Sequence, residues 1–157
     1  MITLTTCPKD CTPISPETLT WCFQACLESF LTDNKLHVTQ KQMVEEGKAK
    51  GLCKDTGVVG SSDEMKKFCS AFHIDFEEIE YQKIPQKIEN GEGVLIGPWA
   101  YKGDPKGQHC VRFCRRIDDQ KFLVMNPKFP TAVCEEWSIE TIAAWQCGVF
   151  KIRLVGA

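Results

Sequence analysis

The sequence lacks the features that mark several classes of protein. No apolar run approaches the roughly 20 residues of a membrane-spanning helix, and the N-terminus has neither the basic start nor the apolar core of a signal peptide. No internal repeat, linker or block of like charge is present, and the net charge is only -2. We therefore expect no nucleic-acid partner and no membrane association. The sequence as given indicates a cytoplasmic protein, with export by a route that needs no cleaved signal as the alternative.

Cysteine, in contrast, is abundant. The chain has ten cysteines in 157 residues, which is below the density of a small disulfide-built scaffold, about 8–10%. We expect most of them to be reduced core residues, because free cysteine behaves as a small apolar side chain. The even number also permits disulfides. A zinc site made from Cys7, Cys11 and Cys53 is a weaker alternative, since no CxxC pair is formed. We expect neither a metal nor a cofactor.

Helical patterns precede strand patterns along the chain. The length predicts a single domain over residues 1–157, with an irregular N-terminal arm over residues 1–18. Thr20 is the expected N-cap of the first helix, and Thr39 opens a capping box. The predicted helices are 21–32, 39–50, 61–72, 85–90 and 138–145, and the predicted strands are 74–79, 94–99, 109–117, 121–126 and 149–155. This order is typical of an α+β fold.

Three residues far apart in the sequence suggest a catalytic site. Cys22 lies in the first turn of a predicted helix, where the helix dipole and the free amide groups favour thiolate over thiol. His109 opens one predicted strand and Asn126 closes the next. Cys, His and Asn in this order are typical of a papain-type triad, in which imidazole transfers protons and a side-chain carbonyl fixes its tautomer. Cys26, one turn further along, is an alternative nucleophile or redox partner of Cys22.

The predicted hairpin offers a geometric test of the His109–Asn126 pair. Opposed residues of an antiparallel pair have position numbers with a constant sum. A four-residue loop over 116–119 gives a sum of 235, which sets His109 opposite Asn126. A two-residue loop gives 237 and keeps both on one face, whereas a three-residue loop separates them. That face also carries Val111, Phe113, Phe122 and Val124, and we expect it to be buried, with Cys110 and Cys114 packing on the other face under a helix. The His109–Asn126 pair would lie at the open end of the buried face, where it can meet the helix that carries Cys22.

The segments around these residues resemble the motif blocks of small bacterial papain-like cysteine peptidases. Two branches are similar: leader peptidases that cut after a double glycine during bacteriocin export, and secreted effector proteases of plant pathogens. The resemblance covers residues 19–127 and rests on Trp21-Cys22-Phe23-Gln24-Ala25-Cys26-Leu27, His109-Cys110-Val111 and Val124-Met125-Asn126-Pro127.

This resemblance implies a papain-like fold, in which an N-terminal helical half that carries the cysteine packs on a C-terminal antiparallel sheet that carries the histidine and asparagine. It implies Cys22 as nucleophile, His109 as base and Asn126 as the residue that orients the imidazole. A protein or peptide would be the substrate, cleaved at a peptide or isopeptide bond through an acyl-enzyme, and the expected state is a monomer. A bacterial effector or toxin protease is one form that this activity takes.

The sequence departs from those relatives at two positions. The bacterial branches usually carry aspartate where this chain has Asn126. They also place a glutamine about six residues before the cysteine to complete the oxyanion hole, and here that position is Pro16. Gln24 lies two residues after the cysteine and points elsewhere on a helix, so Thr18 and Thr20 are the candidate side-chain donors. Loss of one such donor lowers the rate by about 10²–10³.

Other functions fit parts of the same pattern. The machinery that cleaves peptide bonds also hydrolyses the glutamine side chain, so a deamidase or transglutaminase-like effector is the nearest enzymatic alternative. A catalytically inactive peptidase-like binding domain is favoured by the missing glutamine and opposed by the retained cysteine and histidine. A small structural zinc protein is the remaining alternative.

Overall fold

The computed structural model describes residues 2–58, 62–100, 108–145 and 148–155. The order of elements confirms the predicted succession of helices and then strands. The elements are β1 (Ile2–Thr5), α1 (Cys22–Asp33), α2 (Gln40–Ala49), α3 (Ser62–Ala71), β2 (Ile74–Glu78), a 3-10 turn (Tyr81–Lys83), α4 (Ile84–Glu89), β3 (Gly93–Ala100), β4 (Gln108–Arg116), β5 (Lys121–Asn126), β6 (Val133–Ser138), α5 (Ile139–Trp145) and β7 (Val149–Leu154).

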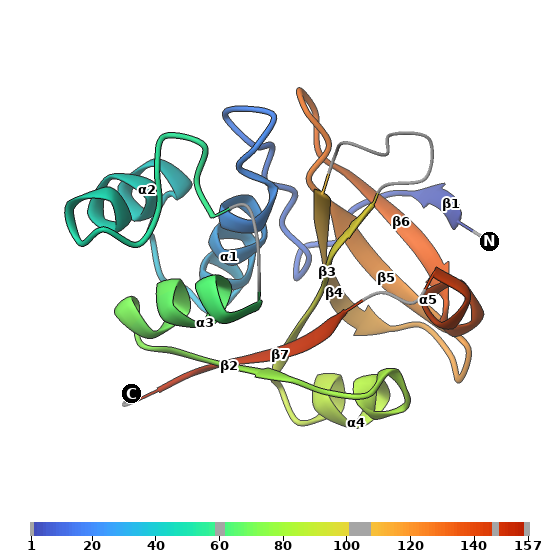
Figure 1. Ribbon diagram of the computed structural model, residues 1–157. Coiled ribbons are helices and arrows are strands. Elements are labelled where there is room, and N and C mark those ends of the chain that lie inside the picture. Colours follow the sequence, from blue (N-terminus) through green and yellow to red (C-terminus); the bar gives the residue numbers. More distant parts are fainter. Residues whose placement is uncertain (1, 59–61, 101–107, 146–147, 156–157) are drawn as a thin grey trace.

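The strands form one antiparallel sheet in the order β1-β6-β5-β4-β3-β7-β2. In Figure 1 the helices α1, α2 and α3 lie together beside this sheet, while α4 and α5 lie against other parts of it. The fold is therefore α+β, with an N-terminal helical half packed on a C-terminal antiparallel sheet, as predicted. Among the described residues, no helix combines the length and the apolar character needed to cross a bilayer.

Helix α1 begins one residue later than expected. Its N-cap is Trp21 rather than Thr20, and no side chain caps the helix. The Trp21 indole N–H instead donates to the Asp55 carbonyl at 2.8 Å, so a tertiary contact holds the residue before the helix. Phe23 and Leu27 are buried on the predicted apolar face. Cys22 is the first helical residue, which confirms its expected place in the first turn. The Thr39 capping box of α2 is confirmed as well, while Ser61, the expected start of the next helix, lies outside the described residues.

The N-terminal arm is less irregular than predicted. Residues 2–5 form β1, which pairs with β6 at the edge of the sheet. Two disulfides then fasten the arm: Cys7 bonds to Cys134 in β6, and Cys11 bonds to Cys114 in β4. The bonds of Cys7 and Cys11 contradict the zinc alternative, and Cys114, expected as a packing residue, packs against the core but is also half of a disulfide. The other described cysteines, at positions 22, 26, 53, 69 and 110, are thiols, and Cys147 lies outside the described residues.

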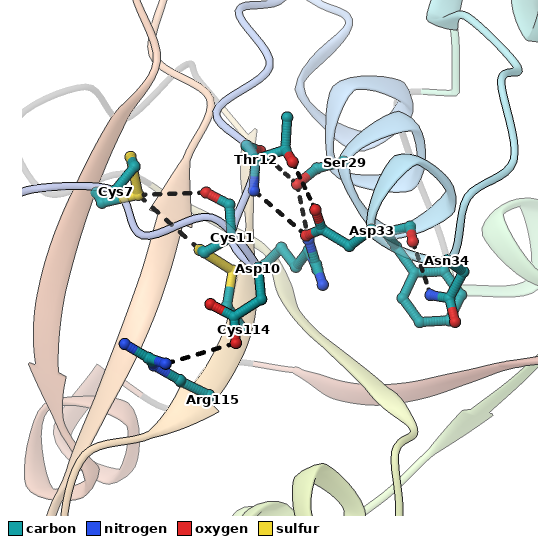
Figure 2. Close-up of polar contacts among 12 residues, drawn as sticks. Cys7, Asp10, Cys11, Thr12, Ser29, Asp33, Asn34, Cys114 and Arg115 are labelled. Carbon is teal, nitrogen blue, oxygen red and sulfur yellow. Dashed lines mark hydrogen bonds and ion pairs between the residues drawn. A yellow bond between two sulfur atoms is a disulfide. The ribbon is translucent and has the colours of Figure 1, made fainter.

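Polar contacts join the same arm to α1 (Figure 2). The Ser29 hydroxyl donates to the Thr12 carbonyl at 2.6 Å, and the Thr12 amide donates to the Asp33 carboxylate at 3.3 Å. Asp33 also forms an ion pair with Arg112 of β4, and both side chains are almost fully buried. The arm, the helix that carries Cys22 and the strand that carries His109 are thus connected to one another by covalent and polar contacts.

The β4–β5 hairpin differs in detail from both expected loops. Its four-residue loop spans 117–120, where the Asp118 carboxylate accepts from the amides of Gln120 and Lys121 at 2.8 and 2.9 Å. Next to the loop, Arg116 pairs with Phe122, a positional sum of 238. A bulge at residue 114 then changes the sum to 237, as in the pair of Arg112 with Met125. At the His109 end the register is therefore the 237 alternative, which keeps His109 and Asn126 on one face, two positions apart.

The sheet is buried on both faces. The predicted buried face packs against α4 and α5 in one cluster, which includes Val111, Phe113, Phe122, Val124, Trp137, Ile84 and Ile142. The helix α1 packs on the opposite face, in a second cluster that includes Cys22, Cys26, Leu27, Cys110 and Met125. We had expected α1 at the open end of the first face. The structure instead places it over Cys110, which confirms Cys110 as a packing residue under a helix.

Candidate active site

Cys22 lies at the start of α1 with 8% of its surface exposed. Burial raises the pKa of its thiol to about 12, and the nearby Cys110 thiol adds to the rise. Hydrogen bonds from the backbone amides of Cys110, Phe23 and Cys22 itself oppose this rise without cancelling it. The helix start was expected to favour thiolate, but burial outweighs it. Cys22 is therefore a neutral thiol at pH 7 in this structure.

His109 is hydrogen-bonded to Asn126, with 2.6 Å between His109 Nε2 and Asn126 Oδ1. His109 is the second residue of β4, and Asn126 is the last residue of β5 and almost fully buried. The expectation that these two residues meet across the hairpin is confirmed. Cys110 directly follows His109 in the chain and its amide hydrogen-bonds the Cys22 sulfur, so Cys22 lies against the backbone of β4 next to His109.

Gly97 in β3 allows the neighbouring strand to approach His109. Its φ is +136°, and a Cβ atom there would lie 2.4 Å from the His109 carbonyl oxygen. The β3–β4 pairing is irregular at this point, between residues 96 and 99. A side chain at residue 97 would have to displace the backbone of His109 itself. The Gly97 amide also donates to the Gly148 carbonyl of the segment before β7 at 2.9 Å, which fixes the glycine from its other side.

Glu135 lies behind Asn126, and we did not expect it from the sequence. This glutamate is in β6, a strand that we did not predict, and 3% of its surface is exposed. Its Oε1 accepts from Asn126 Nδ2 at 2.9 Å and from Trp137 Nε1 at 3.0 Å, and its Oε2 lies 3.4 Å from Lys128 Nζ. No local pattern indicates this strand, because Glu135 and Glu136 interrupt the apolar alternation of residues 133–138.

The charges around His109 act in opposite directions on its protonation. Burial is the largest influence and lowers the pKa of the imidazole below its usual 6.5. The hydrogen bond to Asn126 and the negative charge of Glu135 raise the pKa, while Lys128 lowers it. Because burial dominates, His109 is neutral at pH 7 and can accept a proton. The resting site therefore combines a neutral thiol with a neutral imidazole.

The upstream segment offers no glutamine at the expected oxyanion position. Pro16 is buried there, and the Thr18 and Thr20 hydroxyls lie 3.3 Å apart near the surface, just before α1. Gln24 is fully buried against Gly57, and neither end of its amide has a hydrogen-bond partner among the described residues. The first hydrogen bond of the helix runs from the Ala25 amide to the Trp21 carbonyl. The amides of residues 22–24 precede it and are the donors that the helix start provides.

Cys26 belongs to the core rather than to the surface of the site. It has no exposed surface, and its thiol donates to the Cys110 carbonyl at 3.5 Å. This leaves Cys22 as the cysteine closer to solvent on this side of α1. Within the described ranges, no group of three or more His, Cys, Asp or Glu residues could hold a metal ion.

Comparisons with known proteins identify the fold of this chain but no family. Scans of the sequence against protein-family models and against curated proteins found no match. Among solved structures, a double-glycine-motif protease from an AMS/PCAT transporter, in complex with the leader peptide, is similar with a TM-score of 0.57 and 15% identity. The similarity covers 96% of this chain and 98% of that one. Together with the order of helices and strands, it shows that this chain has the papain-like cysteine protease fold.

Proposed function

We propose that this protein is a cysteine peptidase in which Cys22 is the nucleophile, His109 is the base and Asn126 orients the imidazole. The observation that carries the proposal is the 2.6 Å hydrogen bond between His109 and Asn126. It lies one residue from the position at which β4 contacts the Cys22 sulfur. The fold is that of a protease that binds a leader peptide, and an extended peptide is accordingly the substrate that we propose here.

The hydrogen bonds define the first step. His109 Nε2–H donates a hydrogen bond to Asn126 Oδ1, so the lone pair of the neutral imidazole is on Nδ1. Because Cys22 rests as a thiol, its proton moves to Nδ1 as the sulfur attacks the peptide carbonyl, and a carbon–sulfur bond forms. The amide of Cys22 at the start of α1 is the backbone donor for the resulting oxyanion.

The remaining steps return the site to its resting state. The carbon–nitrogen bond breaks, and the leaving amine takes the proton from His109, which leaves an acyl-thioester on Cys22. Water then attacks this ester while Nδ1 accepts its proton. Collapse of the second oxyanion releases the carboxylic acid product, and the proton on His109 restores the thiol.

Peptide cleavage by matched variants tests the proposal. Wild type, Cys22→Ala and Cys26→Ala are incubated with a peptide library that includes Gly-Gly peptides and their Ala-Ala counterparts. The two substitutions are chemically identical and one helical turn apart, but only the first removes the proposed nucleophile. We expect cleavage by wild type and Cys26→Ala, and none by Cys22→Ala. Equal cleavage by all three proteins would refute the role of Cys22.

A catalytically inactive binding domain is the second candidate, because the Cys22 thiol has a pKa raised to about 12 and Pro16 replaces a glutamine. Under this alternative, library peptides bind to wild type and Cys22→Ala with equal affinity and remain intact. Isothermal titration followed by mass analysis of the recovered peptide separates the two candidates. A covalent acyl adduct at residue 22 excludes the inactive domain.

The two disulfides support an exported protein over a cytoplasmic one. Disulfides persist in oxidising compartments and are rare where glutathione and thioredoxin keep thiols reduced. Both bridges here join the N-terminal arm to strands more than 100 residues later. We propose that the protein acts outside the cytoplasm. Peptide mapping of protein recovered from its native compartment, with free thiols blocked before lysis, tests this: reduced Cys7 and Cys11 would contradict it.

A further inference from the structure

Glu135 is the only acidic side chain that the described residues place in contact with Asn126. Its strand, β6, lies next to β5 in the sheet (Figure 1), with Val133 opposite Asn126 and Glu135 opposite Val124. Glu135 therefore shares a face of the sheet with Asn126, two positions further along. The carboxylate receives three donors, namely Asn126 Nδ2, Trp137 Nε1 and Lys128 Nζ.

The chemistry of a carboxylate determines how the Asn126 amide must be turned. A carboxylate only accepts hydrogen bonds, so the NH₂ end of Asn126 has to face Glu135. The carbonyl end then faces His109, and a carbonyl also only accepts. His109 Nε2 must therefore carry the imidazole proton, and the lone pair is on Nδ1. The Glu135 carboxylate thus determines the orientation of the Asn126 amide, and that orientation determines the tautomer of His109.

We propose that Glu135 is a positioning residue that fixes the orientation of the Asn126 amide and, through it, the tautomer of His109. This proposal rests on the proposed function in one respect only, namely that the peptidase mechanism gives the Nε2–H tautomer a catalytic use. Without an acceptor at residue 135, the two ends of the amide differ little in size, and the amide can turn over. It then presents NH₂ to His109, Nε2 has to accept, and the proton moves to Nδ1, where it blocks the base.

The proposal also accounts for asparagine at residue 126. An aspartate there would place a second carboxylate about 3 Å from Glu135, and like charges at that distance cannot both ionise. An amide avoids this conflict, because it donates to the glutamate with one end and accepts from the histidine with the other. The negative charge of the site is thus on Glu135, one hydrogen bond further from His109.

Nitrogen NMR of the histidines measures the tautomer directly. The chain has three histidines, so protein labelled with ¹⁵N-histidine gives few signals, and His109→Gln identifies the one of interest. At pH 7.5 the imidazole is neutral, and the Nδ1 and Nε2 shifts distinguish its two tautomers. We expect the Nε2–H form in wild type. Glu136→Gln, the same charge change on the next residue of β6, is the matched control and should leave it unchanged.

Two separate routes remove the constraint. Glu135→Leu removes the acceptor, and we expect a mixture of tautomers at His109. Glu135→Gln combined with Trp137→Phe keeps polar character at residue 135 but removes the indole donor that holds its oxygen toward Asn126. The glutamine can then turn its NH₂ to Asn126, and the Nε2–H preference is lost. Each substitution of this pair alone should retain the wild-type tautomer, because one determinant of the acceptor position remains.

The outcomes separate this proposal from the proposed function. Folded Glu135→Leu with an unchanged Nε2–H tautomer would overturn the positioning role, and if that variant does not fold, the double variant decides in the same way. A changed tautomer together with a loss of kcat of about 10- to 100-fold, typical of a residue that orients another, supports both proposals. A changed tautomer in a protein that cleaves no peptide supports the positioning role and removes the peptidase.

Discussion

The two disulfides should stabilise this fold in a non-additive way, because they close overlapping loops. Cys7–Cys134 spans 127 residues and Cys11–Cys114 spans 103. The four sulfurs are close together, with 3.9 Å between those of Cys11 and Cys134. A bridge restricts the unfolded chain more when the loop that it closes is longer. Once one bridge is present, however, the second closes only the short ring between the two.

The loop lengths set the expected magnitudes. Either bridge alone closes a loop of more than 100 residues and contributes about 4.7–4.9 kcal/mol in the chain-entropy description. With the other bridge already formed, the ring runs only from Cys7 to Cys11 and from Cys114 to Cys134, about 24 residues, and the contribution falls to about 3.5 kcal/mol. Loss of either bridge should therefore cost about 3.5 kcal/mol, and loss of both about 8 kcal/mol.

Urea unfolding of bridge-free variants measures these values. The variants are Cys7→Ala/Cys134→Ala, Cys11→Ala/Cys114→Ala and all four together, and Cys69→Ala corrects for a lost buried thiol, at about 1 kcal/mol. Each loss should be read as the change in the free energy of unfolding at unchanged m-value. Single-bridge losses below 1 kcal/mol after this correction would show that the bridges do not hold the arm. A combined loss of about 7 kcal/mol, the sum of two equal single losses, would contradict the shared ring.

Two further predictions concern the site. Because the pKa of His109 is lowered, the fold favours the neutral imidazole, and the stability that this contributes is present above pH 6.5 and is lost as the pH falls below it. Because the pKa of Cys22 is raised, the fold favours the neutral thiol, and the stability that this contributes is lost as the pH rises above 9.0. Melting temperatures from pH 5 to 10 should show both limbs, and an acid limb that is the same in His109→Gln would contradict the first. Gly97→Ala should lower the free energy of unfolding by about 3 kcal/mol or more and remove most of the activity, since its Cβ would meet the His109 carbonyl oxygen. Gly91→Ala is the control, also at positive φ but with open space around it, and should cost about 1 kcal/mol. Equal losses of the two variants in urea unfolding would refute the steric argument.

Local patterns were sufficient to predict how the site is assembled. The apolar spacing of residues 23–31 defines α1 and leaves Cys22 in its first turn, whatever caps the helix. The period of two in a strand determines which residues share a face, and so His109 and Asn126 were expected to meet in two of the three registers that were considered. The observed register was one of these two, although a bulge at residue 114 and an Asp118 turn produced it.

The features that the sequence did not predict all depend on distant partners. Residues 2–5 (Ile-Thr-Leu-Thr) alternate apolar and polar side chains as a strand does, but a run of this length was not recognised, and β6 supplies the edge with which it pairs. Cys114 has the spacing of a packing residue, and only the arm that crosses β4 brings Cys11 to it. Strand β6 was missed because Glu135 and Glu136 interrupt its apolar alternation. A glutamate is buried only where hydrogen-bond donors contact its carboxylate. One of those donors is Asn126. Glu135 therefore both obscured the strand in the sequence and completes the site.

The resting charges of the site indicate when the nucleophile must form. Burial raises the pKa of Cys22 and lowers that of His109, so both changes oppose a stable thiolate–imidazolium pair before substrate binds. Proton transfer is then tied to attack on the carbonyl, and its cost depends on how well the site accommodates the new imidazolium. The negative charge that favours an imidazolium is the Glu135 carboxylate, which acts through Asn126 and is partly balanced by Lys128. Neutralising Lys128 should accordingly raise the pKa of His109, whereas neutralising Glu135 should lower it.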